Sequence, residues 1–538
     1  MSSTTLFESS SAIIFEKAPV VFDSSELKAK LTTPFENSYT FGILKLKAAK
    51  IECPDKSHHF VFTIDRSGSM TDTCADGRTK QQHIAHTFKN MLWFFHDHPH
   101  IRVRISIFLF DYEVVQILDR VIITSENIDA IIKKIDLIRP RGDTNIGLAI
   151  QTVNDFVRDE ILLREIDSEV SHIFMTDGDA NRGETAPAIL KSFVNNTFKN
   201  VFVGFGIEHN DIILNALCSH YNSAYYFIDK LENSGLVYGE ILHSLLYKLL
   251  IGTEIKIENG LLYDFKNDVW VRNLYVGDIV GEADKTYHIV SEKPADCVIN
   301  IAGNKFDSKE FVFLPVRNVV FEDNLTCYVF RQKTLQLLHE VKDFSNKEKE
   351  KTKNVNAWDF FQKNNYVDVE SDNNKIVKNY KGKMKDLMEE MKEYMTVNGL
   401  ENDNFMKNLC DDIYVCYRTF GTAYSGMYTN ARLVSQGTQR CYTVSDTPDL
   451  VLPNNVFHNT NASVVGTFED HVLSHFDDTP YSSPTALELM RSISDGNDDN
   501  DCFDNGDNGD NGDNGNNGNN GNDRNSLYLS PSSCEENS

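Results

Sequence analysis

Residues 59–250 alternate short apolar runs with stretches in which apolar residues recur every three or four positions. The short runs, such as HFVFTI at 59–64 and SHIFMT at 171–176, are typical of strands buried on both faces. The periodic stretches, such as residues 145–162, are typical of helices with one apolar face. This alternation predicts an α/β fold, with a doubly wound and mostly parallel sheet covered by helices on both sides.

The period changes after this α/β region. Residues 251–325 consist of short segments that alternate apolar and polar positions between Gly, Asn and Asp turns, which predicts a small antiparallel β-domain. In the N-terminal segment 1–58, residues 38–52 show the same alternation, so we expect them to contribute strands to that β-domain. Residues 326–440 return to helical periodicity and predict a helical region, whose methionine-rich stripe we interpret as core packing.

Regular periodicity fades in the last part of the chain, residues 441–538. Within it, residues 504–521 repeat Asp-Asn-Gly and then Asn-Asn-Gly. The repeat lacks the loop pattern and the closing Glu of an EF-hand calcium site. Because Gly, Asn and Asp leave nothing to bury, we predict a mostly irregular segment that ends in a disordered, low-complexity tail without a role in metal binding.

Charge and cysteine content narrow the expected partners and location. The chain has 53 Lys and Arg against 79 Asp and Glu, a formal net charge of −26, which disfavours nucleic acid and anionic membranes as partners. No apolar run approaches the roughly 20 residues of a membrane span, and the start lacks the basic region of a secretion signal. The ten scattered Cys show no zinc-site spacing. We therefore expect a cytoplasmic protein with reduced thiols, or one in a host cytoplasm or virion if the source is viral.

Three loops carry the candidate chemistry. Asp65, Ser67 and Ser69 follow the first apolar strand of the α/β region in the pattern Asp-x-Ser-x-Ser. Thr144 opens a helix, and Asp177 follows a later strand within Thr-Asp-Gly. Because ligand sites of doubly wound sheets lie at the carboxyl ends of the strands, we expect these five side chains to converge on one point.

The order, spacing and strand context of these motifs resemble the von Willebrand factor type A domain (VWFA or VWA) with an intact metal-ion-dependent adhesion site (MIDAS). The resemblance covers somewhat over a third of the chain and implies a Rossmann-like fold and a bound Mg²⁺, with Mn²⁺ or Ca²⁺ as alternatives. It implies that Ser67, Ser69 and Thr144 supply hydroxyl ligands. Asp65 and Asp177 would lie close behind them and act largely through water. The overall layout resembles intracellular multidomain members found in eukaryotes and large DNA viruses.

A cation held by neutral hydroxyl groups keeps most of its charge, so it retains an electrophilic position that a partner's Asp or Glu can fill. The first hypothesis is therefore a metal-dependent protein-binding module or scaffold that engages an acidic side chain of a partner protein. We expect no enzyme and no catalytic residues. No pattern in the sequence indicates an oligomeric state.

The alternative hypothesis is a metal-dependent hydrolase, or an accessory subunit of an ATPase or ubiquitin-ligase machine. The sequence contains no Walker A motif and no RING cysteines, so the chain itself is expected to be neither the motor nor the ligase. A metal hydrolase favours carboxylates directly on the ion and a general base beside it, whereas this motif offers mainly hydroxyls. The cluster His96, His98 and His100 surrounds a proline, and we interpret it as a solvated turn.

Overall fold

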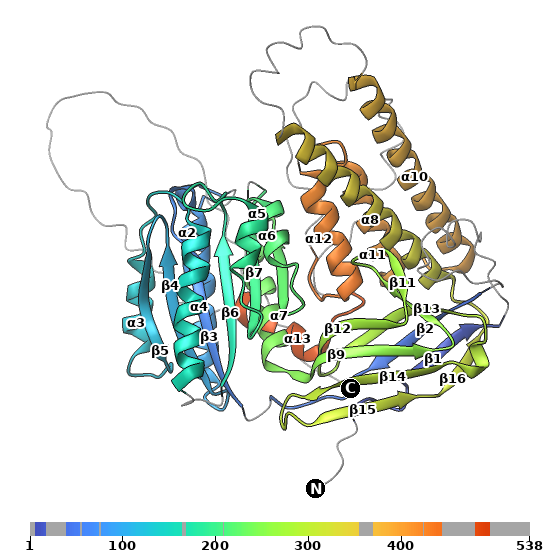
Figure 1. Ribbon diagram of the computed structural model, residues 1–538, viewed down its shortest axis with the longest axis horizontal. Helices are drawn as coiled ribbons and strands as arrows, with labels where there is room; N and C mark the ends of the chain where they lie inside the picture. Colours follow the sequence, from blue (N-terminus) through green and yellow to red (C-terminus); the bar gives the residue numbers. More distant parts are fainter. Residues whose placement is uncertain are drawn as a thin grey trace, which may run out of the picture. The chain divides into compact units, whose positions relative to one another are not determined.

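The computed structural model describes residues 6–17, 39–53, 56–74, 77–163, 168–207, 209–353, 369–422, 424–443 and 479–494. The repeat at 504–521, predicted to be a disordered tail, lies outside the described residues. Within them, the predicted fold class is confirmed: a mostly parallel sheet with helices is followed by antiparallel sheets and a helical region (Figure 1).

The α/β region is built on a six-stranded sheet with the strand order β5-β4-β3-β6-β7-β8. The pairs among β4, β3, β6, β7 and β8 are parallel, and the edge strand β5 is antiparallel to β4. The six strands are β3 (Ser57–Asp65), β4 (Val103–Phe110), β5 (Val114–Val121), β6 (Ser168–Thr176), β7 (Lys199–Phe205) and β8 (Ser223–Ile228).

Helices cover both faces of this sheet, as the alternating apolar runs predict (Figure 1). Phe60 and Phe62 of β3 share one core with α2, α3 and α7, whereas the intervening Val61 belongs to the opposite face with α4. On the face that α4 covers, side chains of α5 and α6 pack against those of α4. The helices are η1 (Gly68–Thr71), α2 (Lys80–Asp97), α3 (Ile128–Asp136), α4 (Ile146–Leu163), α5 (Pro187–Ser192), α6 (Asp211–Leu217), η2 (Leu231–Asn233) and α7 (Ser234–Leu246).

Two further sheets form a sandwich, with the strand orders β11-β10-β13-β2-β1-β16 and β12-β9-β14-β15. Their facing side chains, such as Phe15 and Leu44 from one sheet and Ile255 and Ile299 from the other, share a core. The strands are β1 (Ala12–Glu16), β2 (Thr40–Lys47), β9 (Lys248–Glu258), β10 (Leu261–Asp264), β11 (Val269–Val271), β12 (Asn273–Val280), β13 (Asp284–Ser291), β14 (Val298–Lys305), β15 (Phe311–Val316) and β16 (Val319–Glu322), with η3 (Pro294–Asp296) between β13 and β14.

The sandwich differs from the predicted β-domain in two details. It begins at Lys248 rather than at residue 251, because α7 ends at Leu246 and the chain passes almost directly into β9. The strand expected in residues 38–52 is β2, which pairs antiparallel with β13 and β1. However, β1 pairs with β16 in parallel, so the sheets are not purely antiparallel.

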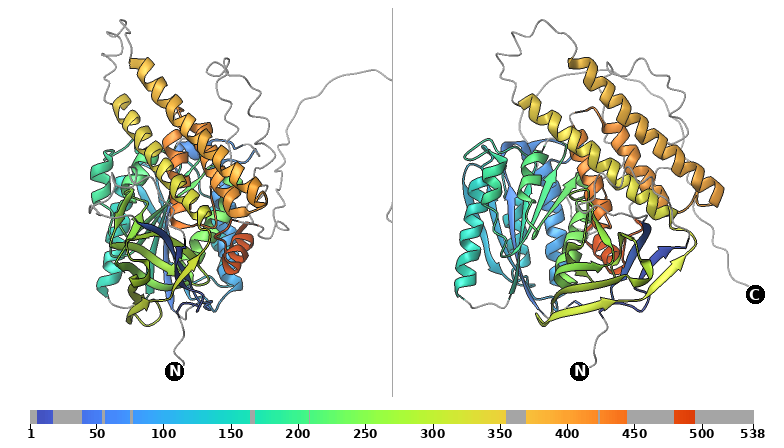
Figure 2. Two further views of the ribbon diagram at one scale, coloured as in Figure 1. Left: turned by 90° about the vertical axis from the view of Figure 1, so that its right-hand side faces the viewer. Right: turned by 45° about the vertical axis from the view of Figure 1, so that its right-hand side comes forward.

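The helical region consists of α8 (Thr326–Lys353), α10 (Val369–Asn398), α11 (Asn404–Thr419) and α12 (Ser425–Thr438). Figure 2 shows α8 and α10 side by side, and the Lys333 ammonium on α8 lies 2.7 Å from the Glu390 carboxylate on α10. Met384, Met388 and Met391 of the methionine-rich stripe are buried in the core of this region, so the interpretation of the stripe as core packing is confirmed.

A further helix, α13 (Pro484–Ser494), lies in the part of the chain that was expected to be mostly irregular. Its Met490 and Ile493 side chains join the core formed by α2 and α7. The approach is close, because a Cβ atom on Gly239 of α7 would lie only 2.4 Å from the Met490 Cα. Sequence periodicity over eleven residues is too short a signal to separate such a helix from irregular chain, so its existence depends on the surface it covers.

The structure shows the state of the cysteines and the hydropathy of the helices. Cysteines of the described residues, including Cys297 and Cys416, are free thiols. Burial raises the pKa of each of these two thiols to about 12, so both are protonated and weakly reactive at neutral pH. Among the helices of the described segments, none is both long and apolar enough to cross a membrane.

Candidate metal centre

The five predicted site residues lie at the carboxyl edge of the parallel sheet. Asp65 is the last residue of β3, and the chain then turns through Ser67 and Ser69 into η1. Asp177 directly follows β6, which is the neighbour of β3 in the sheet. Thr144 precedes α4. The predicted convergence therefore follows from strand order, because adjacent parallel strands end at the same edge.

Hydrogen bonds connect the side chains of Ser67, Ser69 and Asp177, and the Ser67 backbone joins Asp65 to them. The Ser69 hydroxyl donates to Asp177 Oδ1 over 2.8 Å, and the Ser67 and Ser69 hydroxyl oxygens are 3.1 Å apart. Asp65 accepts from the Ser67 backbone N–H over 2.7 Å and from the Thr176 hydroxyl over 2.5 Å. The carboxylates are thus oriented by the chain itself, with hydroxyl groups between them.

Gly178 marks the space on which the site residues converge. A Cβ atom at this position would lie 3.4 Å from Thr144 Oγ1, 3.7 Å from Ser69 Oγ and 3.9 Å from Asp65 Oδ2. Oxygen atoms from the Asp65 loop and the Thr144 loop therefore lie within 4 Å of the space beside Gly178, which belongs to the third loop. Hydroxyl and carboxylate oxygens are the ligands that Mg²⁺ prefers, so the donor set fits a hard divalent cation.

The comparisons with known proteins identify the α/β region. Residues 60–239 match the family model of the von Willebrand factor type A domain. This region is a VWA domain. No curated protein sequence matches the chain significantly.

Several solved structures are similar to the chain at low sequence identity. One is a von Willebrand factor type A protein from Catenulispora acidiphila, with 13% identity, 64% of this chain and 84% of that chain covered, and a TM-score of 0.42. The ArnB paralog VWA2 from Sulfolobus acidocaldarius has 13% identity, 74% and 92% coverage and a TM-score of 0.40. Proximal thread matrix protein 1 from the mussel byssus, with a zinc-occupied MIDAS motif, has 18% identity, 34% and 43% coverage and a TM-score of 0.25.

The Thr144 loop of the VWA domain is held by Asn181, a residue that the sequence analysis did not single out. The Thr144 backbone N–H donates to Asn181 Oδ1 over 2.7 Å, and the Thr144 carbonyl accepts from the Asn181 backbone N–H over 3.2 Å. Asn181 lies in the connection that follows β6. The Thr144 loop and the Asp177 loop are therefore locked together, which fixes where the threonine hydroxyl lies.

Asp111, which directly follows β4, connects the Asp65 loop to the Thr144 loop and was also missed. Its buried carboxylate lies 3.0 Å from Arg66 Nε and 2.9 Å from Arg141 Nε. Its carbonyl accepts from the Asn145 backbone N–H over 2.9 Å. Arg66 occupies a variable position of Asp-x-Ser-x-Ser, so the motif pattern gave no signal for this ion pair. The result is a rigid frame around the hydroxyl groups.

Lys80 is the third site residue that sequence reasoning missed. Its ammonium group lies 2.7 Å from Asp177 Oδ2 and 3.2 Å from Asp72 Oδ2. Burial opposes the charge of Lys80, but hydrogen bonds to and charges on Asp177 and Asp72 outweigh it and raise the lysine pKa. One carboxylate of the site therefore carries a built-in counter-ion.

The second carboxylate of the site, Asp65, forms no ion pair with a cationic side chain of the described residues. Burial raises the pKa of Asp65 to about 7, the charge of Asp177 adds to the rise, and the hydrogen bonds from Thr176 and Ser67 oppose it. A cation placed near Asp65 would favour its ionised form. The environment of Asp65 thus suits a carboxylate that faces a metal ion.

Other candidate ligands lie apart from this arrangement. Within the described part of the chain, no group of three or more His, Cys, Asp and Glu could hold a metal ion. His98 Nδ1 lies 2.8 Å from the Phe94 carbonyl, and His96 contacts Asp97 and Ser125. These two histidines therefore form hydrogen bonds at the C-terminal end of α2. The candidate centre depends on hydroxyl oxygens instead.

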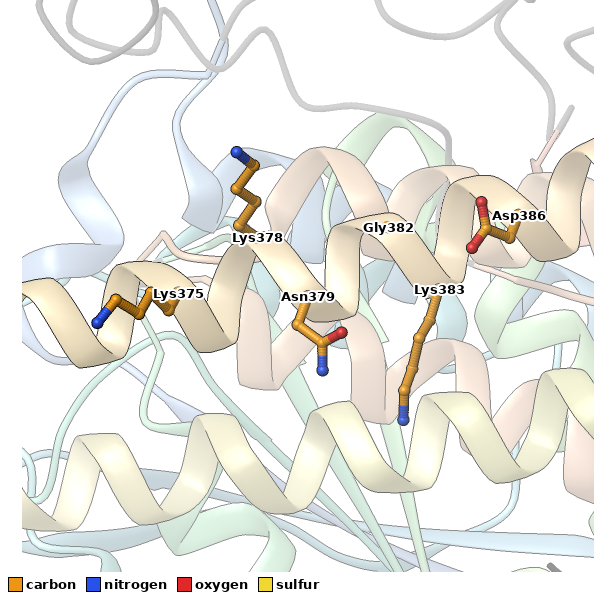
Figure 3. A pocket seen from close by; sticks show the side chains of 6 residues that line it. All are labelled: Lys375, Lys378, Asn379, Gly382, Lys383 and Asp386. Atoms are coloured by element: carbon orange, nitrogen blue, oxygen red, sulfur yellow. The ribbon is translucent and has the colours of Figure 1, made fainter.

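A hollow of about 390 Å³ lies on α10 in the helical region (Figure 3). None of the five predicted site residues lines it. Its described lining comes from that single helix: Lys375, Lys378, Asn379, Gly382, Lys383 and Asp386. It is therefore a surface feature of α10 and not part of the metal centre.

Proposed function

We propose that the VWA domain binds one divalent cation and uses it to bind an acidic side chain of a partner protein. Ser67, Ser69 and Thr144 would hold the ion through their hydroxyl groups, with Asp65 and Asp177 close behind. The observation that carries this proposal is the gathering of oxygen atoms from the Asp65 and Thr144 loops around the open space at Gly178 of the third loop. We expect Mg²⁺, with Mn²⁺ or Ca²⁺ as alternatives, because all are oxygen-preferring cations.

The surroundings of the site support access for a protein ligand. Ser67 and Thr144 are buried, but Ser69 is only partly buried, and the neighbouring Gly68 and Asp143 are exposed. An ion held mainly by neutral oxygens would supply an electrophilic position for a carboxylate. A partner's Asp or Glu could therefore reach the centre from solvent without unfolding a loop.

The orientation of the carboxylates favours binding over hydrolysis. Both Asp65 oxygens accept hydrogen bonds, from Ser67 and Thr176, and Asp177 accepts from Ser69 and Lys80. A metal hydrolase needs a carboxylate or another base free to take a proton from water. We therefore infer a binding module and scaffold rather than a hydrolase. A role as an accessory subunit of a larger ATPase or ubiquitin-ligase machine is compatible with the same binding chemistry.

The test combines direct ion binding with partner capture. Isothermal titration of the full chain with Mg²⁺ and Mn²⁺ should give one site, and Asp65→Ala and Thr144→Ala should weaken binding at least about tenfold. Pull-downs in Mg²⁺ should recover a partner that EDTA and both variants release. Circular dichroism must show that the variants stay folded.

The matched control is Asp119→Ala, which removes an exposed carboxylate of β5 that forms an ion pair with the adjacent Arg120. It should bind ion and partner like the wild type. Unchanged ion affinity in Asp65→Ala and Thr144→Ala would contradict the proposed centre. If the ion binds normally but EDTA does not release the partner, the partner's carboxylate does not bind through the ion, and this part of the proposal is contradicted.

The compartment is part of the same proposal. Free thiols such as Cys297 and Cys416 suit a reducing environment, so we propose a cytoplasmic location, in the host or virion if the source is viral. Immunofluorescence and fractionation of the tagged full chain test this. Recovery of the protein in the medium or in a membrane fraction would contradict it.

A further inference from the structure

Lys80 occupies a position that helix electrostatics disfavour. It is the first residue of α2, where the partial positive charge of the helix dipole repels a cation. The first turn of α2 contains no acidic residue to compensate. Lys80 is also buried, with 9% of its surface exposed. Something outside the helix must therefore stabilise this ammonium group.

Two carboxylates stabilise it, and they differ in exposure. Asp177 Oδ2 lies 2.7 Å from the Lys80 ammonium, and the Asp177 side chain is fully buried. Asp72 Oδ2 lies 3.2 Å away, but 53% of its side chain is exposed, so water screens its charge. Asp177 is consequently the dominant partner of the lysine.

The main chain holds Lys80 in this place. The Lys80 backbone N–H donates to the Asp72 carbonyl over 3.0 Å, and an isolated β-bridge joins Thr73 to Thr79. The Thr79 side chain caps α2 in a capping box with Gln82. The ammonium is therefore a fixed feature of the site rather than a freely moving surface charge.

The contact also orients Asp177. With Oδ2 on Lys80, the other oxygen, Oδ1, accepts from the Ser69 hydroxyl over 2.8 Å. Lys80 thus holds the carboxylate in the rotamer that faces the hydroxyl groups. It also cancels one of the two negative charges that Asp65 and Asp177 bring to the site.

We propose that Lys80 is a positioning residue that tunes the centre, lowering its affinity for divalent cations and raising the affinity of the loaded centre for an acidic ligand. This inference rests on the proposed function. With the exposed and screened Asp72 left out, Asp65, Asp177 and Lys80 together carry one net negative charge, so a divalent ion makes the loaded centre positive. Without Lys80 the loaded centre would be neutral, and its long-range attraction for a carboxylate would disappear.

The test replaces the charge and measures two affinities separately. Lys80→Gln removes the charge and keeps an N–H donor, Lys80→Met removes both, and Lys80→Arg keeps the charge. Mn²⁺ alone is titrated into the full-length chain by electron paramagnetic resonance. Glutarate is then titrated into the Mn²⁺-loaded protein, with water proton relaxation as the readout. Lys89→Gln is the control, because Lys89 lies on the same helix and pairs with Asp136 over 2.8 Å.

We expect Lys80→Gln and Lys80→Met to bind Mn²⁺ about tenfold more tightly and, once loaded, to bind glutarate several-fold more weakly. Lys80→Arg and Lys89→Gln should resemble the wild type. If both charge-removing variants stay folded and lose affinity for Mn²⁺ and glutarate alike, Lys80 only supports the fold and the inference is overturned. That result would leave the proposed function intact, because the wild type would still bind the ion. Absence of Mn²⁺ binding in the wild type and in all variants would overturn both.

Discussion

At the scale of single residues, the candidate centre is oriented by the chain before any ion is considered. Asp65 is held by Ser67 and Thr176, and Asp177 is held by Ser69 and Lys80. Such fixed dipoles and charges need little rearrangement when a cation arrives, which lowers the cost of binding it. The space proposed for the cation lies beside Gly178, which has no side chain to fill it.

Filling this space tests the geometry directly. In Gly178→Ala the new methyl group would make ordinary contacts with Thr144 Oγ1 and Ser69 Oγ, at 3.4 and 3.7 Å, so the fold should tolerate it. The same methyl group would occupy the convergence point of the oxygens. We expect Mn²⁺ affinity to fall at least about tenfold with an unchanged melting temperature. Thr144→Ser, which keeps the hydroxyl, is the control and should bind normally. Full Mn²⁺ affinity in Gly178→Ala would place the ion elsewhere.

At the scale of elements, α7 is enclosed between the sheet and α13. Gly235 and Gly239 lie one turn apart on α7 and let the backbone of α13 approach, because Cβ atoms there would lie 2.6 Å from Ser494 Cα and 2.4 Å from Met490 Cα. Glu240, on the same helix, accepts hydrogen bonds from the backbone N–H groups of Cys441 and Tyr442. Three separate parts of the chain therefore meet on α7.

Enlarging Gly239 should detach α13. A valine side chain there would collide with the α13 backbone, which cannot move aside as a flexible side chain would, so we expect Gly239→Val to cost about 2 kcal/mol. Hydrogen exchange should become faster in peptides covering 484–494. Gly382→Ala is the control, since no atom of the described residues lies within 4 Å of a Cβ atom at Gly382, and helix propensity predicts a gain of up to about 1 kcal/mol. Unchanged exchange of α13 in Gly239→Val would refute the close packing.

At the scale of the whole molecule, the VWA domain, the sandwich and the helical region share buried surfaces. Leu214 of α6 lies in one core with Met427 and Tyr428 of α12. Arg440 donates to the Tyr225 carbonyl over 2.8 Å and lies 3.8 Å from the centre of the Tyr226 ring. The proposed binding site of the VWA domain therefore belongs to a body whose regions cannot separate without exposing apolar side chains.

Buried histidines should make the stability of this body depend on pH. Burial lowers the pKa of His58 to about 3 and the pKa values of His172 and His243 to about 4, below their ordinary value of 6.5. The unfolded chain then binds more protons than the folded one between pH 6.5 and 4. The stability contributed by these histidines is therefore complete above about pH 6.5 and falls as the pH drops, by up to about 1.4 kcal/mol per pH unit for each histidine. Burial raises the pKa values of Asp65 and Asp412 to about 7, which offsets part of this loss.

The measurement is the urea midpoint of the full chain at pH 7.5 and pH 5.5, which should be lower at pH 5.5. His172 bonds to Thr63 Oγ1 over 2.9 Å and to Asn200 Oδ1 over 3.2 Å, and His172→Gln can keep one such bond without titrating. This variant should show a smaller shift between the two pH values. Equal midpoints for the wild type at both pH values would contradict the prediction.

The sequence by itself determined the features whose signal is local. Alternation of apolar runs and helical periodicity predicted the doubly wound α/β fold, because burial on one face or on both faces repeats with the geometry of the element. The methionine stripe predicted a buried helix face for the same reason. The motif Asp-x-Ser-x-Ser predicted the place of Asp65, Ser67 and Ser69, since residues that directly follow a parallel strand lie at its carboxyl edge.

Only the tertiary structure decided which groups meet across the loops. Lys80 and Asp177 are 97 positions apart, and Asn181 reaches Thr144 from another connection, so no periodicity or spacing reports these contacts. The same holds for the pairing of β1 with β16. It also holds for α13, whose short apolar face is buried only because Gly235 and Gly239 let it pack closely on α7. Such contacts depend on which surfaces come together when the chain folds. Local sequence patterns indicate only which side of each helix or strand is buried.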